Sequence, residues 1–156
     1  MQLDTMATAV TFAVTLPALL VAHNVADHWV QSDAQAAHKN LRSRAGRVAC
    51  LRHVVSYTLV TAGTVAVLWW LLDLPITGLG FVVGQLVSAV THYWADRRHT
   101  LARLATLIGH RGFYALGAPR PDHDDNPSLG TGAYALDQSW HWLWLGVASL
   151  LTAVLR

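Results

Sequence analysis

The sequence predicts an all-α integral membrane protein, a single domain over residues 1–156 that forms a four-helix bundle of two helical hairpins. Of the 156 residues, 53% are hydrophobic and 13% are charged, against roughly 25% charged in an average soluble domain. The chain has no glutamate and one lysine, Lys39, so the side chains that usually cover a soluble bundle are missing. Because about 20 apolar residues span a bilayer, this length suits four spans and leaves no room for a separate catalytic domain.

The first two spans are expected over residues 6–31 and 48–72. We interpret the first as an uncleaved span, because no basic residue precedes its apolar run and no cleavage site of small residues follows it. Pro17 lies inside this span and is expected to kink the helix, which membrane helices tolerate better than soluble ones. The second span ends in Trp69 and Trp70, a pair suited to the lipid headgroup region.

The third span is expected over residues 76–96, after a tight turn. It carries Gly80, Gly84 and Ser88 at four-residue spacing, and small residues at that spacing let two helices approach closely. This face is therefore the expected contact of a homodimer.

Residues 98–117 alternate leucine with arginine, which predicts an amphipathic helix on the cytoplasmic membrane surface. Residues 118–132 are rich in proline and glycine and include the acidic stretch 122–125, so they predict an irregular loop. The fourth span closes the chain over residues 133–155.

Basic residues orient the bundle, because Lys and Arg accumulate on the cytoplasmic side of a membrane. Of the eleven, five flank the connection between spans one and two, five follow span three, and Arg156 ends the chain. Both basic connections are thus expected in the cytoplasm and both termini outside a bacterial inner membrane. The net charge of +2 follows from this asymmetry and gives no indication of nucleic-acid binding.

Each expected span also carries polar or ionisable side chains, which are costly in a bilayer and usually face the bundle interior. Within a span most of them lie three or four residues apart, so they share one helical face. At about 1.5 Å per residue, the four span histidines fall roughly 21 to 29 Å from the outer membrane face, in one layer near the cytoplasmic edge. The groups are His23, Asp27 and Gln31, then His53 and Tyr57, then His92 and Asp96, and finally Asp137, Gln138 and His141.

Spans one and three share a short pattern, His-x-x-Ala-Asp, at His23–Asp27 and His92–Asp96. Each is followed by a span with a histidine near its start, which suggests a hairpin used twice about an axis along the membrane normal. Matches of this length also arise by chance, so a duplication stays open.

Taken together, these motifs resemble those of a family of small bacterial four-helix membrane proteins catalogued as a domain of unknown function. The resemblance rests on His23-x3-Asp27-x3-Gln31 with Lys39 beyond it, His53 followed by Tyr57, His92-x3-Asp96, and Asp137-Gln138-x2-His141. It covers nearly the whole chain. It implies the membrane placement and the importance of these positions, and it supplies no activity.

The pattern indicates a divalent-metal site. A His and an Asp four residues apart present a nitrogen and an oxygen from one helical face, and inward His and carboxylate groups on four helices are how di-metal bundles are built. Zn, Mn and Fe all suit nitrogen and oxygen ligands, and the single Cys50 excludes a thiolate cluster. The expected ligands of one or two ions are His23, Asp27, His53, His92, Asp96 and His141, with Gln31 and Gln138 supporting them.

If the site is catalytic, its depth near the cytoplasmic edge favours hydrolysis of a lipid or a phosphate ester. The expected catalytic residues are Asp137 and Tyr57, with Tyr93 a second possible proton donor. Arg52, Arg97 and Arg98 are expected to hold a phosphate, because guanidinium groups pair with it bidentately.

Two other classes stay open. One is a transporter of ions, protons or metal, although transporter sites usually lie near the midplane on broken helices. The other is a structural or regulatory bundle whose polar side chains hydrogen-bond between helices. His99, His110 and His123 are expected to be solvated or interfacial residues outside any site.

Overall fold

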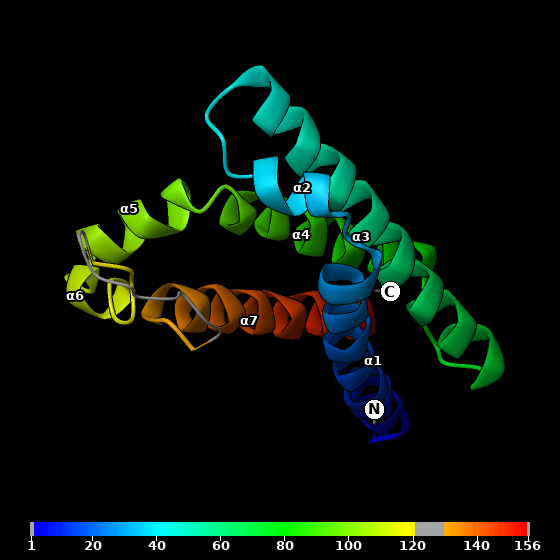
Figure 1. Ribbon diagram of the computed structural model, residues 1–156. Coiled ribbons are helices and arrows are strands. Elements are labelled where there is room, and N and C mark those ends of the chain that lie inside the picture. Colours follow the sequence, from blue (N-terminus) through cyan, green and yellow to red (C-terminus); the bar gives the residue numbers. More distant parts are fainter. Residues whose placement is uncertain (1, 121–129, 156) are drawn as a thin grey trace.

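A computed structural model describes residues 2–120 and 130–155, and it is helical throughout with no strand in that part of the chain (Figure 1). The first helix α1 continues directly into a π-helical turn, η1, and six further α-helices follow. The elements are α1 (Gln2–Val25), η1 (Ala26–Val30), α2 (Asp33–His38), α3 (Arg44–Leu71), α4 (Gly78–Asp96), α5 (His99–Leu107), α6 (Arg111–Tyr114) and α7 (Gly132–Val154).

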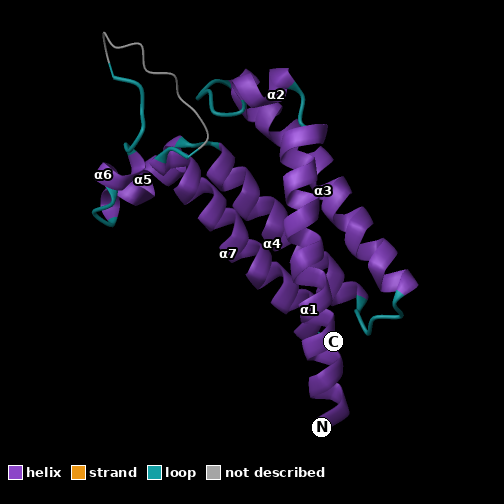
Figure 2. Ribbon diagram, turned by 60° about the horizontal axis from the view of Figure 1, so that its bottom comes forward, coloured by secondary structure: helices purple, strands orange, loops and turns teal. Residues whose placement is uncertain are grey.

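Four long helices, α1, α3, α4 and α7, make the body of the molecule. Figure 2 shows them running alternately in opposite directions, with both termini and the α3–α4 turn at one end and the short helices α2, α5 and α6 at the other. Helix α7 packs on α4 and α1, and α3 packs on α1 and α4. The end with the short helices, called here the basic end, contains both arginine-rich connections.

Local sequence signals set where the helices begin. A hydroxyl group precedes each of four helices and accepts a hydrogen bond from a backbone N–H in the first turn, which satisfies a donor that has no partner within the helix. At α2 the cap is reciprocal, because Gln35 also accepts from the backbone of Ser32. The capping residues are Ser32, Ser43, Thr77 and Thr131.

The region expected to form one amphipathic helix contains two shorter ones, α5 and α6. Arg98 has a φ of 50°, and the N–H of His99 donates to the carbonyl of Arg97 at 2.5 Å, a tight γ-turn that separates α5 from α4. Gly109, with a φ of 81°, follows α5. The expected loop lies mostly outside the described residues, and so do its acidic stretch 122–125 and His123.

Over the described residues the bundle exposes many large apolar side chains, and it buries polar side chains beside an apolar core that includes Leu19, Val65 and Leu145. Large apolar side chains on the four long helices are exposed, among them Val21, Leu59, Leu86 and Leu143. Hydroxyl and amide side chains are buried instead: Thr11, Thr15, Thr61, Gln85, Ser88, Ser149 and Thr152.

Two stretches, Asp4–Val30 and Arg44–Leu71, are long and apolar enough to cross a membrane by length and composition. Among the described residues, helices α4 and α7 do not meet the same criterion; Gln85 and His92 lie in α4, and Asp137 and His141 lie in α7. Spanning by all four helices therefore stays a prediction.

The small residues of α4 pack against α7 inside the chain. A methyl group added at Gly84 would overlap the Thr152 hydroxyl and lie 2.9 Å from the Ala148 carbonyl oxygen, and one at Gly80 would lie 2.8 Å from the Thr152 carbonyl oxygen. Gly80, Gly84 and Ser88 are all buried. They serve a contact within one chain, and the homodimer expected through them stays a prediction.

We expect Gly84→Ala to destabilise the bundle by about 2 kcal/mol, because the new methyl group must push α4 away from the backbone of α7. Thermal unfolding of the detergent-purified protein measures this. The control is Gly63→Ala on α3, where an added methyl group meets nothing within 4 Å and the better helix former should leave the melting temperature equal or higher. Equal losses in the two variants would contradict the tight α4–α7 contact.

Candidate functional site

Histidines from all four long helices meet inside the bundle. His23 on α1, His53 on α3, His92 on α4 and His141 on α7 are each at most 3% exposed. Ring centroids lie 4.8 Å apart for His23 and His141, 4.4 Å for His92 and His141, and 5.1 Å for His53 and His92. The four histidines that the sequence predicts to lie at one depth in the bundle are thus neighbours in the structure.

Two carboxylates complete the centre of this cluster. The Nε2 atoms of His53 and His92 lie 3.0 Å apart. Asp96 Oδ2 is 3.2 and 3.3 Å from these two nitrogens, and Asp27 Oδ1 is 3.3 and 3.5 Å from them. We call His53, His92, Asp27 and Asp96 the central tetrad.

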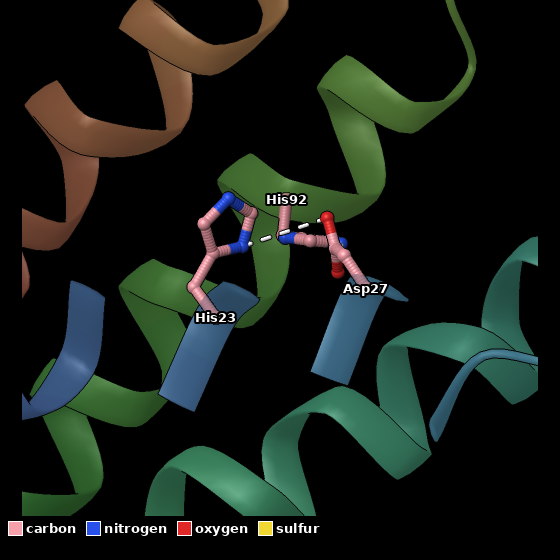
Figure 3. A group of neighbouring side chains, drawn as sticks. All are labelled: His23, Asp27 and His92. Atoms are coloured by element: carbon pink, nitrogen blue, oxygen red, sulfur yellow. Dashed lines mark ion pairs between the residues drawn. The ribbon is translucent and has the colours of Figure 1, made fainter. Parts of the chain in front are cut away.

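Asp27 also connects the tetrad to His23. Its Oδ2 lies 3.6 Å from His23 Nδ1, while Oδ1 faces His92. Figure 3 shows His23 and His92 reaching Asp27 from two different helices. Asp27 lies in η1, where the N–H of Gln31 bonds to the carbonyl of Ala26, and such π-helical turns occur frequently at functional sites.

Many polar atoms of the cluster are buried without a hydrogen-bond partner among the described residues. Buried polar groups in proteins are nearly always hydrogen-bonded, so a concentration of exceptions calls for an explanation. They include Nδ1 of His53 and His92 and Nε2 of His141, whereas Asp27 Oδ1 and Asp96 Oδ2 face only imidazole nitrogens 3.2 to 3.5 Å away.

These buried groups could hold a metal ion. Three overlapping sets each bring three candidate ligand atoms within 4.8 Å of one another. The sets are His23, Asp27 and His92, then His53, His92 and Asp96, and then Asp96, Asp137 and His141. All six expected metal ligands belong to at least one of them.

Lys39 is a member of the site that the sequence analysis did not assign. Its ammonium group is buried and lies 2.8 Å from Asp96 Oδ1, so one oxygen of Asp96 faces a cation and the other faces the histidines. The sequence did contain a signal that could have pointed to Lys39. It is the only lysine of the chain, and it lies in the motif that carries the family resemblance.

Arg97 holds Lys39 in place. Its guanidinium group is buried and donates from Nη1 to the Lys39 carbonyl at 2.6 Å and from Nη2 to the Leu41 carbonyl at 2.5 Å. These bonds tie the connection between α2 and α3 to the end of α4. Of the three arginines expected to hold phosphate, Arg97 is thus engaged with the backbone, while Arg52 and Arg98 are exposed and outside the cluster.

The expected catalytic residues contact different histidines of the cluster. The Tyr57 ring stacks on His92 at 3.9 Å between centroids, and its hydroxyl shares a 2.6 Å hydrogen bond with Ser88. The Asp137 side chain is 26% exposed and lies 3.6 Å from His141 Nδ1. That nitrogen donates instead to the Asp137 carbonyl at 2.8 Å.

The supporting and peripheral residues are placed as follows. Gln138 Nε2 donates to Asp137 Oδ2 at 3.4 Å, and Gln31 is half-buried with its Nε2 atom unpartnered among the described residues. His110 is exposed and His99 is half-buried. Both repeated His-x-x-Ala-Asp pairs lie in the cluster, although their origin by duplication stays a prediction.

The fold and the site define a class of protein, an all-helical bundle with a buried cluster of histidines and aspartates. The chain matches the family model DUF3307, described as a protein of unknown function, over residues 15–155. It therefore belongs to the DUF3307 family. No curated protein and no solved structure matches it.

We expect Lys39→Met to destabilise the protein by about 3 kcal/mol, because it leaves Asp96 buried without its cation. Lys39→Arg retains a cation and should recover much of the loss. Arg44→Met, at an exposed position of the same basic end, serves as the control in thermal unfolding. A melting temperature for Lys39→Met equal to that of the control would show that the ion pair does not stabilise the fold.

Proposed function

We propose that this chain is a multi-pass membrane protein whose four long helices span a bacterial inner membrane, with the basic end in the cytoplasm and both termini outside. We further propose that the central tetrad binds a divalent ion, Zn, Mn or Fe, and that the site hydrolyses a lipid or a phosphate ester. The arrangement of charge and polarity supports the first part, and the geometry of the tetrad supports the second.

The membrane placement rests on the distribution of polar and apolar surface. A soluble protein exposing so many large apolar side chains would aggregate, because contiguous apolar patches on monomers are normally small. In a bilayer the same surface faces lipid, while the buried hydroxyl groups of Thr15, Thr61 and Thr152 hydrogen-bond within and between helices. The arginine-rich connections lie together at one end, as the preference of basic residues for the cytoplasmic side requires.

The observation that carries the metal proposal is the set of distances in the tetrad. Five separations between its ligand atoms fall between 3.0 and 3.5 Å. A tetrahedral ion with bonds of about 2.0 to 2.1 Å separates its ligands by about 3.3 to 3.4 Å. An octahedral ion with bonds of about 2.1 Å separates neighbouring ligands by about 3.0 Å. These five separations match the ligand spacing of either geometry, and His53, His92 and Asp96 form a complete set of three candidate ligand atoms.

The choice of geometry decides between a structural and a catalytic site. Four protein ligands close a tetrahedral zinc site, whereas an octahedral ion such as Mn keeps two positions for water. A divalent ion with an open position supplies a nucleophile at neutral pH, because it lowers the pKa of water bound to it. Among the surrounding groups Asp137 is the carboxylate most open to solvent, which suits it to accept a proton.

We expect the detergent-purified protein to contain about one equivalent of a transition metal per chain, measured by elemental analysis. His53→Ala removes the contacts of one imidazole to His92, Asp27 and Asp96 and should abolish binding. His110→Ala, at an exposed position, should retain it. Less than about 0.2 equivalents in the wild type after addition of Zn or Mn would favour a purely structural polar network.

We expect Asp137→Asn to retain the metal and to lower hydrolysis by about 10² to 10⁴ fold, the usual contribution of a general base. The assay compares turnover of phospholipids and isoprenoid phosphates by the protein in liposomes with the flux of the bound ion across the same liposomes. Flux without turnover would assign the site to transport and overturn the hydrolase proposal.

A further inference from the structure

The basic end contains a groove of about 790 Å³ that is separate from the buried cluster. Its walls come from the α2–α3 connection, from α3, from the end of α4 and from α5. The side chains that line it are Arg42, Arg47, Tyr93, Arg97, His99, Ala102, Arg103 and Thr106. We call this the basic groove.

The charge of the basic groove is one-sided. Four arginines and a histidine line it, and no acidic residue does. Within the described part of the chain, no carboxylate lies within ion-pair distance of Arg42, Arg47 or Arg103. Like charges gathered from four segments repel one another, so an anion between them would stabilise the arrangement.

One arginine of the groove is already held in place. Arg97 is buried, and two of its N–H groups are fixed on the carbonyls of Lys39 and Leu41. A guanidinium has five N–H donors, so Arg97 retains N–H groups beyond the two that bond to these carbonyls. His99 also lines the groove, and its Nδ1 atom is buried without a hydrogen-bond partner among the described residues.

We infer that the basic groove binds a phosphate group, carried either by an anionic phospholipid headgroup or by a soluble phosphate compound. Arginine side chains match the planar, bidentate geometry of phosphate oxygens, and four segments contribute them to one concave surface. The inference does not depend on the metal site. It also differs from the set of arginines expected from the sequence, because only Arg97 belongs to both.

In the membrane placement proposed above, on which this part of the inference rests, the groove lies at the end of the bundle where lipid headgroups would be. It is bounded by α5, whose Leu101 and Ala105 are buried against the bundle while Arg103 and Thr106 are exposed. Tyr93, on the last turns of α4, accepts from Cys50 Sγ at 3.8 Å through its carbonyl, so α3 and α4 are in contact beside the groove. A phosphate there would join α3, α4 and α5.

The test measures binding to detergent-purified protein by native mass spectrometry and by thermal shift. The probes are phosphatidylglycerol, the zwitterionic phosphatidylcholine and inorganic phosphate. The test variant carries Arg42→Gln, Arg47→Gln and Arg103→Gln, all at exposed positions. The matched control is Arg111→Gln on α6, an exposed arginine at the same end that does not line the groove.

We expect the triple variant to bind its anionic probe at least about tenfold more weakly, because it loses three guanidinium groups that would donate charge-assisted hydrogen bonds to phosphate oxygens. Arg111→Gln should bind as the wild type does, and both variants should melt as the wild type does without a probe. A preference for phosphatidylglycerol over the other two probes assigns a lipid headgroup, and binding of inorganic phosphate assigns a soluble ligand. Failure of both anionic probes to bind, or equal binding by the triple variant, would overturn the inference.

Discussion

The constraint on which this structure depends is the burial of two carboxylates, Asp27 and Asp96, inside a bundle that is apolar outside. An isolated charge in such surroundings is too costly to persist, so the neighbouring elements are arranged to offset it. His53 and His92 approach both carboxylates, and Lys39 approaches Asp96 from the basic end. The cluster is therefore a centre of fold stability as well as the place where a metal ion would bind.

The tight contact between α4 and α7 positions the rings of this cluster. Gly84 lets the two backbones come close, and two turns further along α4 His92 meets His141 with 4.4 Å between ring centroids. A bulkier residue at Gly80 or Gly84 would move His92 and His141 apart. At the end of α4, Arg97 bonds to the α2–α3 connection, which carries Lys39. Arg97 therefore positions Lys39 beside the cluster and also lines the basic groove.

Much of the fold was predictable because hydropathy and helix periodicity are local properties. The long helices α1, α3, α4 and α7 lie close to the expected spans, and the inward histidines follow from their spacing on one face. The short helix α2 was not expected, although Ser32 and Gln35 form a capping box in the sequence. The break at Arg98 was not predictable either, because a positive φ at an arginine arises from tertiary contacts and not from its intrinsic preference.

The sequence by itself determined that the fold is all-helical, which histidines and aspartates form the polar layer, and that basic residues gather at one end. Each of these follows from composition and from periodicities of three to four residues. Only the tertiary structure decided which polar atoms touch. The pairing of Lys39 with Asp96 joins residues 57 positions apart, and the basic groove gathers Arg42, Arg47, Arg97 and Arg103 from four segments. The physical reason is that the sequence specifies the inward face of each helix, whereas the rotation and approach of neighbouring helices depend on how all their side chains pack together.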